Sequence, residues 1–146
     1  MITDKLLRVS EDQAVTASAV STNTIDLSVA RDIGEGHNLF VVFTVTETFA
    51  TLTSLTFQVV TDDNASLSSP TVIGATGAIT LAGGGLAAGK QHVVRIPPQI
   101  GGKGERYIGA QYTVGGSSAT AGKVTTDIVL DIQDGKKFYA SGFSVA

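Results

Sequence analysis

The chain has 146 residues and a mass of 15.0 kDa, which is the size of one domain and excludes a second full one. Charged residues make up only 16% of the sequence, against roughly 25% in typical soluble domains. The formal net charge is −3 and like charges form no cluster, so electrostatic binding to nucleic acid has no support. Because the chain has no cysteine, a disulfide framework, a zinc–thiolate site and a thiol nucleophile are also excluded.

The N-terminal residues 1–22 are rich in Ala, Ser, Thr and Val but show no clear period. This composition favours an extended N-terminal arm that lies over a neighbouring chain, or a strand at a sheet edge. Lys5 and Arg8 are not followed by the apolar run of a secretory signal, so we expect synthesis in a cytoplasm without export. The longest strongly apolar stretch, 39–45, is too short to span a membrane, and we expect no membrane partner.

The remaining residues, 23–146, are predicted to form one all-β domain. Sixteen Val, ten Ile and eighteen Thr favour strands, because branched side chains pack well on a pleated surface. The segment 55–59 alternates apolar and polar residues, which is typical of a half-buried strand. In 126–132 the same alternation predicts Ile128, Leu130 and Ile132 inward, with Asp127 and Asp131 outward. Further strands are predicted at 23–29, 39–45, 71–73, 78–81, 93–96 and 106–114.

The segment 39–45 differs because its apolar side chains point to both faces. Such a strand lies in the middle of a sandwich, or its outer face is covered by another segment or subunit. About eight short strands, separated by Gly-rich and Asp-rich turns and closed at Pro97-Pro98, predict a jelly roll or a related antiparallel two-sheet β-sandwich.

Two motifs resemble catalytic or nucleotide-binding sites. Residues 84–90 satisfy the first seven positions of a phosphate-binding loop, but Gln91 replaces the Ser or Thr that binds magnesium. The residues that follow are β-branched and end at proline, whereas a phosphate-binding loop must open a helix. His37 and His92 are the two histidines, and without a G-x-S-x-G elbow we interpret both as surface or strand-edge residues.

Acidic residues leave two weaker alternatives open. Asp62-Asp63-Asn64 and Asp131 to Asp134 could supply oxygen ligands to calcium, but turn chemistry explains both without a metal. Glu35, Glu47 and Glu105 could in principle form the carboxylate pair of a glycosidase. We favour neither alternative, and we predict no cofactor, no metal and no enzymatic activity.

The surface character of the sequence points instead to contact with other proteins. A neutral exterior, the doubly apolar strand 39–45, the aromatic tail 138–143 and the loops 83–89 and 101–104 suggest contact surfaces. The alternative is that the aromatic residues of the tail complete the core of the domain itself. The candidate contact residues are Leu6, Leu7, Phe40, Val42, Leu86, Lys103, Phe138, Tyr139 and Phe143.

Segments along nearly the whole chain resemble the capsid cement proteins typified by that of a Bordetella phage. No single segment is a catalytic signature, and the likeness is specific in aggregate. The segments that carry it are 1–7, 13–16, 21–27, 31–36, 94–98, 105–109, 112–114, 121–124 and 139–143.

The resemblance implies a jelly-roll protein on the outside of an icosahedral phage head, where it joins subunits of the major capsid protein. It also implies a homo-oligomer, a dimer or a trimer, located in the virion and without enzymatic activity. A phage tail component, or a receptor-binding or glycan-binding β-sandwich, is the alternative. A glycan site would need an exposed aromatic platform, and the chain has no Trp and only three Tyr.

Overall fold

The computed structural model describes residues 2–30, 38–96 and 105–132. These residues form ten strands and one short 3-10 helix, η1, at Lys5–Leu7. The strands are β1 (Arg8–Ala14), β2 (Ala19–Val20), β3 (Ile25–Asp26), β4 (Leu39–Ala50), β5 (Ser54–Asp62), β6 (Thr71–Ala75), β7 (Ile79–Thr80), β8 (Gln91–Ile96), β9 (Tyr107–Gly115) and β10 (Ala121–Val129).

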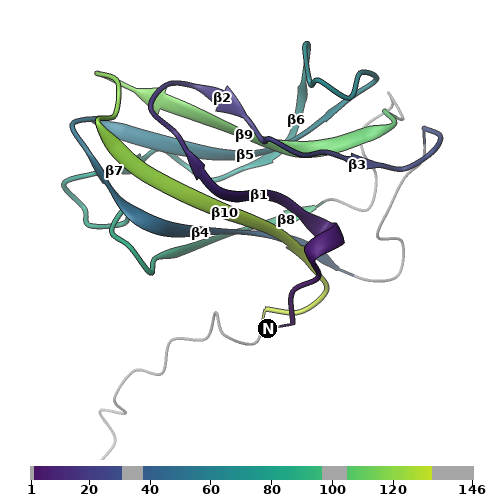
Figure 1. Cartoon of the computed structure of the whole chain (residues 1–146), viewed down its shortest axis with the longest axis horizontal. Coiled ribbons are helices and arrows are strands. Elements are labelled where there is room, and N and C mark those ends of the chain that lie inside the picture. Colours follow the sequence, from purple (N-terminus) through teal and green to yellow (C-terminus); the bar gives the residue numbers. More distant parts are fainter. Residues whose placement is uncertain (1, 31–37, 97–104, 133–146) are drawn as a thin grey trace, which may run out of the picture.

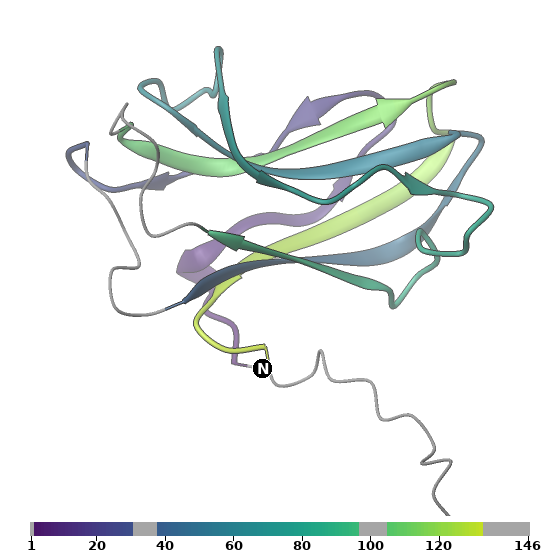
Figure 2. The same cartoon turned by 180° about the vertical axis from the view of Figure 1, so that it is seen from behind.

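The strand pairings are nested like those of one long hairpin. β1 pairs with β10, β2 and β3 with β9, β4 with β8, and β5 with β6 and β7. Two further pairings, β10 with β4 and β9 with β5, roll this hairpin into two antiparallel sheets. Their orders are β1-β10-β4-β8 and β2-β9-β5-β6, which is the arrangement of a jelly roll. The two layers face each other in Figures 1 and 2, so the predicted two-sheet sandwich is confirmed.

The core lies between the layers and follows the alternation of the strands. Leu55, Phe57 and Val59 are all fully buried, as the period of two in 55–59 predicts. Phe57 packs against Phe43 of β4 with ring centroids 5.0 Å apart, and both rings meet Tyr112 of β9 edge-on at 6.2 Å. Aromatic side chains from three strands of the two sheets therefore form the centre of the sandwich.

Two sequence expectations about strand ends and one about burial are corrected. The strand expected at 23–29 shrinks to Ile25–Asp26, because Asp26 accepts a hydrogen bond from the Ser28 N–H and Ser28 has a φ of 69°. The strand expected at 126–132 begins earlier and ends at Val129, so Leu130 lies outside it and is 63% exposed instead of inward. Asp127, expected outward, is buried because Arg8 pairs with it.

The N-terminal residues form edge strands, as one of the two alternatives from the sequence expected, although alternation did not locate these strands. β1 is an edge strand of one sheet and β2 is an edge strand of the other, which brings the described count to ten instead of eight. β1 reads Arg-Val-Ser-Glu-Asp-Gln-Ala, and its pairing with β10 shifts register on both sides of Ser10. These bulges break the period of two, which is why the sequence pattern does not reveal the strand.

A buried chain of hydroxyl groups joins the two sheets. The Tyr112 hydroxyl lies 2.7 Å from Ser10 Oγ and 2.8 Å from Thr126 Oγ1, and all three residues are fully buried. Ser10 donates its one hydroxyl proton to Gln13 Oε1, so Tyr112 donates to Ser10 and in turn accepts from Thr126. Each buried hydroxyl thus has a partner, and β9 is linked to β1 and β10.

Replacing Tyr112 with phenylalanine is expected to lower the free energy of unfolding by about 1–3 kcal/mol, since two buried hydroxyls lose a partner. Burial also raises the pKa of Tyr112 from 10.0 to about 12. Above pH 10 the unfolded chain therefore releases this proton before the folded one does, and stability falls up to pH 12. Denaturant titrations across this range should show the wild-type chain losing about 2–3 kcal/mol more than Tyr112→Phe. Equal losses in the two proteins would contradict the prediction.

Candidate contact surface

Large apolar side chains are exposed at the end of the sandwich where the N-terminus lies beside the last residues of β10 (Figure 1). Ile2 is 95% exposed, Leu6 83%, Leu130 63% and Leu7 37%. Single exposed apolar side chains are common on proteins, but a group of them in one place marks a contact surface. We call this group of four side chains the apolar end.

The local sequence explains how this end is built. Asp4 caps η1: its side chain accepts a hydrogen bond from the Leu6 N–H at 2.9 Å, and its carbonyl accepts one from the Leu7 N–H at 3.0 Å. The short helix places two adjacent leucines on the surface directly before β1 begins at Arg8. The two leucines of the apolar end therefore lie on a capped turn that β1 holds to the sandwich.

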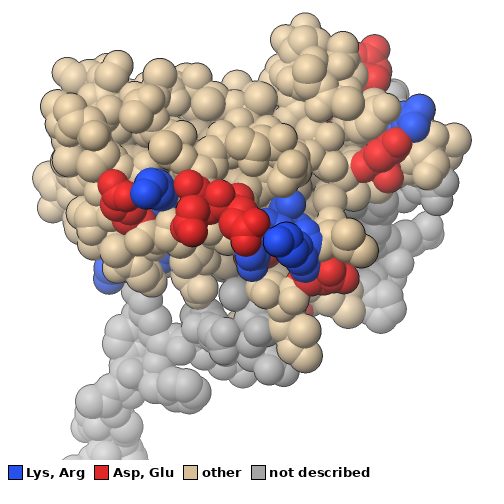
Figure 3. All heavy atoms as spheres, viewed as in Figure 1, with Lys and Arg blue, Asp and Glu red and all other residues tan. Residues whose placement is uncertain are grey.

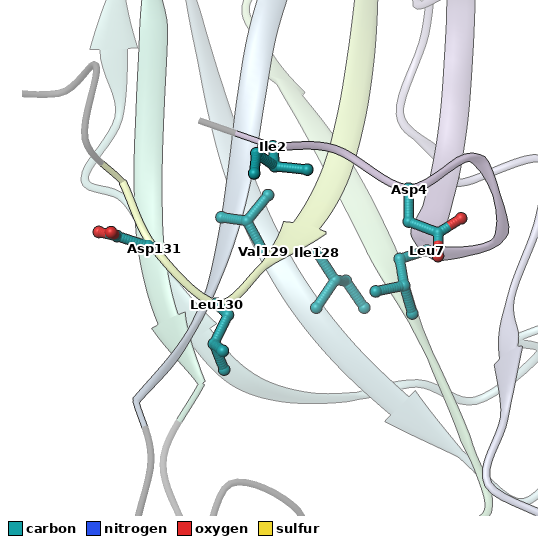
Figure 4. A pocket seen from close by; sticks show the side chains of 7 residues that line it. All are labelled: Ile2, Asp4, Leu7, Ile128, Val129, Leu130 and Asp131. Carbon is teal, nitrogen blue, oxygen red and sulfur yellow. The ribbon is translucent and has the colours of Figure 1, made fainter.

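A cavity of about 350 Å³ lies within the apolar end. Most of its wall is aliphatic, and Figure 4 shows the carboxylates of Asp4 and Asp131 at opposite sides of the group. A volume of this size is within the range of pockets that bind small molecules or anchor side chains, roughly 300–1,000 Å³. The lining residues are Ile2, Asp4, Leu7, Ile128, Val129, Leu130 and Asp131.

A partly buried ion pair anchors the apolar end to the sheet. Arg8 Nε lies 2.8 Å from Asp127 Oδ1, and the side chains are 24% and 7% exposed. Arg8 also contacts Glu11 at 3.1 Å. The hydrogen bond to Asp127 is the main cause that raises the pKa of Arg8. The guanidinium thus fixes the start of β1 against β10, one residue after Leu7.

Most charged side chains on the face shown in Figure 3 gather in a band, with a smaller group at the right-hand edge, and the surface above the left and middle of the band is uncharged. Several charged side chains of the described residues form ion pairs, including Lys123 with Glu47 at 2.9 Å and Lys5 with Glu11 at 3.9 Å. Pairing of opposite charges leaves little net field to attract a polyanion.

The outer face of the β2-β9-β5-β6 sheet is polar but uncharged along the middle of β5 and β9. Thr56 and Gln58 are opposite Thr113 and Gln111, and Thr113 donates a hydrogen bond to Gln58 Oε1 at 2.7 Å. Their chain neighbours Phe57 and Tyr112 face the core, so these four side chains point outward. This neutral sheet face is a second surface that can approach another protein without removing charges from water.

The structure separates the predicted contact residues into three groups. Leu6, Leu7 and the half-buried Phe40 reach the surface. Val42 and Leu86 are corrected: they are 1% and 0% exposed, so neither offers side-chain surface to a partner.

Val42 lies in the interior strand β4 between Asp127 and Val93, and the loop carrying Leu86 folds back onto Phe49. The remaining candidates, Lys103, Phe138, Tyr139 and Phe143, lie outside the described residues.

The glycine-rich motif at 84–90 forms turns that lead into the strand β8. Since no helix begins there, the motif lacks the N-terminal dipole that a phosphate-binding loop needs, as the sequence predicts. His92 of β8 is half-buried, stacks on Phe57 at 5.2 Å, and its Nε2 lies 2.7 Å from the Gly85 carbonyl oxygen. This histidine therefore holds the glycine loop onto the core, and His37 lies outside the described residues.

Two of the acidic candidates, Asp62 and Glu105, have structural partners, whereas Glu35 and Asp134 lie outside the described residues. Asp62 is buried and accepts hydrogen bonds from the backbone N–H groups of Asn64 and Ser69, which closes the turn after β5. These bonds favour the ionised carboxylate, and the pKa of Asp62 is lowered although its burial acts in the opposite direction. Glu105 accepts hydrogen bonds from Thr61 and Thr71.

Within the described ranges, no three His, Asp or Glu side chains come close enough together to hold a metal ion. Those ranges also contain no helix that is long and apolar enough to cross a membrane.

Fold and surface together define a jelly-roll β-sandwich with an apolar end and an uncharged outer face along β5 and β9. The chain belongs to the Bbp16 family, whose sequence model matches residues 9–128 and so covers the sandwich from β1 to the penultimate residue of β10. Bbp16 is a family of Bordetella phage proteins. No curated protein matches the chain.

Proposed function

We propose that this protein is a capsid decoration protein, which binds the outside of a phage head and stabilises contacts between major capsid subunits. The observation that carries the proposal is its membership of a Bordetella phage family over most of the chain. The jelly-roll sandwich, the uncharged face of β5 and β9 and the apolar end support a role in binding rather than catalysis. The proposed partners are the major capsid protein and further copies of this chain, and the proposed location is the virion.

The physical mechanism is mass action combined with multivalency. Molecules that bind the assembled shell and not its free subunits shift the equilibrium toward the shell. Several modest contacts suffice, because binding through one raises the effective concentration for the next. The apolar end supplies a contact driven by burial of Leu6 and Ile2, while the neutral face of β5 and β9 can approach a neighbour without breaking ion pairs.

Heat-induced release of DNA from phage heads tests the proposal. Heads stripped of this protein should release DNA at a lower temperature than intact heads, and adding the purified chain back should restore the original temperature. Gold-labelled copies should decorate heads in electron micrographs. Labelling of tails alone, or equal release temperatures, would refute the proposal.

A single substitution tests the apolar end. We expect Leu6→Asp to weaken binding to stripped heads roughly 10- to 100-fold per site, because burying a leucine contributes about 1.5–3 kcal/mol. Since Leu6 is 83% exposed, the free energy of unfolding should change by less than about 0.5 kcal/mol. Val29→Asp is the matched control, with Val29 55% exposed near the end of β3. Equal binding by both variants in a sedimentation assay would remove the apolar end from the contact surface.

A further inference from the structure

The cavity at the apolar end lies beside the end of β10, close to the point where the described residues end at Ile132. Leu130 and Asp131 form part of its wall, and Ile132 is the next residue. Fourteen residues, 133–146, follow Ile132 in the sequence. We propose that this segment of the same chain turns back and places the aromatic pair Phe138 and Tyr139 in the cavity. The inference does not depend on binding to a capsid.

The length of the chain allows the return. Six residue steps separate Ile132 from Phe138, and an extended chain spans at most about 20 Å over six residues. Asp134-Gly135 lies between them, and this dipeptide is a strong signal for a tight reversal of the chain. The aromatic pair can therefore reach a cavity whose wall begins at Asp131.

The chemistry of the segment matches that of the cavity. Its wall is mainly aliphatic, and its volume of about 350 Å³ exceeds that of a 150 Å³ cavity known to hold a benzene ring. The two acidic residues of the wall, Asp4 and Asp131, are matched by Lys136 and Lys137, which directly precede Phe138. An aromatic ring preceded by cations thus meets an apolar cavity flanked by carboxylates.

The short connection favours the cavity of the same chain over that of a second copy. A short flexible linker holds its two ends at an effective concentration of roughly millimolar. A second copy must reach a comparable concentration in solution to compete. Docking within one chain should therefore be independent of protein concentration in the micromolar range.

A single tryptophan reports on this docking, because the natural chain contains none. In Phe138→Trp the emission should lie at shorter wavelength than in the matched control Ser144→Trp, and acrylamide should quench it less. Adding Leu130→Asp to Phe138→Trp should reduce the ratio of docked to free segment roughly tenfold or more. Adding Val72→Asp, on the other sheet, should leave the emission unchanged.

Three results would overturn the proposal. The first is the same emission and quenching in Phe138→Trp and Ser144→Trp. The second is a Phe138→Trp signal that is insensitive to Leu130→Asp. The third is a shift that disappears on dilution, because it would assign the cavity to the segment of a second copy. Circular dichroism of each variant confirms that the sandwich is folded, so that a lost signal is attributed to the segment.

Discussion

Replacing Gly122 with alanine is expected to remove a large part of the stability of the sandwich. Gly122 lies near the start of β10 with a φ of +136°, which L side chains rarely adopt. A Cβ at this position would lie 2.5 Å from Cγ and Cε1 of Phe49, and closer still to Cδ1. Phe49 is a core residue with 2% exposure, so it cannot move aside without opening a cavity elsewhere.

Two costs therefore add. The backbone conformation contributes about 1–3 kcal/mol of strain. Overpacking costs a further ~1–3 kcal/mol. Their sum is a large part of the roughly 5–15 kcal/mol that stabilises an ordinary domain. Gly77→Ala is the control, because its Cβ would meet nothing within 4 Å.

Urea denaturation of the two variants measures the difference. Gly77→Ala should unfold close to the wild-type midpoint, whereas Gly122→Ala should unfold at much lower urea or fail to fold. Combining Gly122→Ala with Phe49→Leu should recover part of the loss by giving the new methyl group room, but not the part due to φ. Similar midpoints for Gly77→Ala and Gly122→Ala would contradict the explanation.

The sequence predicts the architecture because the signals for it are local. Alternation in 55–59 and the doubly apolar run in 39–45 depend on neighbouring residues, and the structure places both segments in strands with paired neighbours on each side. Val41 and Phe43 of the second segment face the core. Burial of Val42 on the same strand agrees with the expectation that a strand apolar on both faces lies inside a sheet.

Features that depend on distant pairings could not be predicted in this way. Asp127 alternates with apolar neighbours and so was expected at the surface, but its partner Arg8 lies 119 positions away in the sequence. The cavity between Ile2 and Leu130 has the same origin, since only the pairing of β1 with β10 brings these residues together. Sequence reasoning identified Leu6 and Leu7 but missed Ile2 and Leu130, and no local signal marks the latter pair.

Removing the Arg8 side chain is expected to have the second large effect on stability. Asp127 is 7% exposed and would lose the guanidinium 2.8 Å away. Breaking a buried ion pair from one side costs about 3–5 kcal/mol, because the remaining charge stays buried without a partner. Arg8→Ala should therefore lower the free energy of unfolding by an amount near this range, measured by urea denaturation.

Lys123→Ala is the matched control for Arg8→Ala. It breaks an ion pair of the same sheet with Glu47, but those side chains are 45% and 44% exposed, and water screens exposed pairs so strongly that they contribute little to stability. The double variant Arg8→Met with Asp127→Leu removes both charges and should regain most of the lost stability. If the double variant is as unstable as Arg8→Ala, the loss comes from packing of the arginine stem rather than from the unpaired carboxylate.

Because Arg8 directly follows η1, Arg8→Ala should also loosen Leu6 and Leu7 and weaken head binding, whereas Lys123→Ala should not.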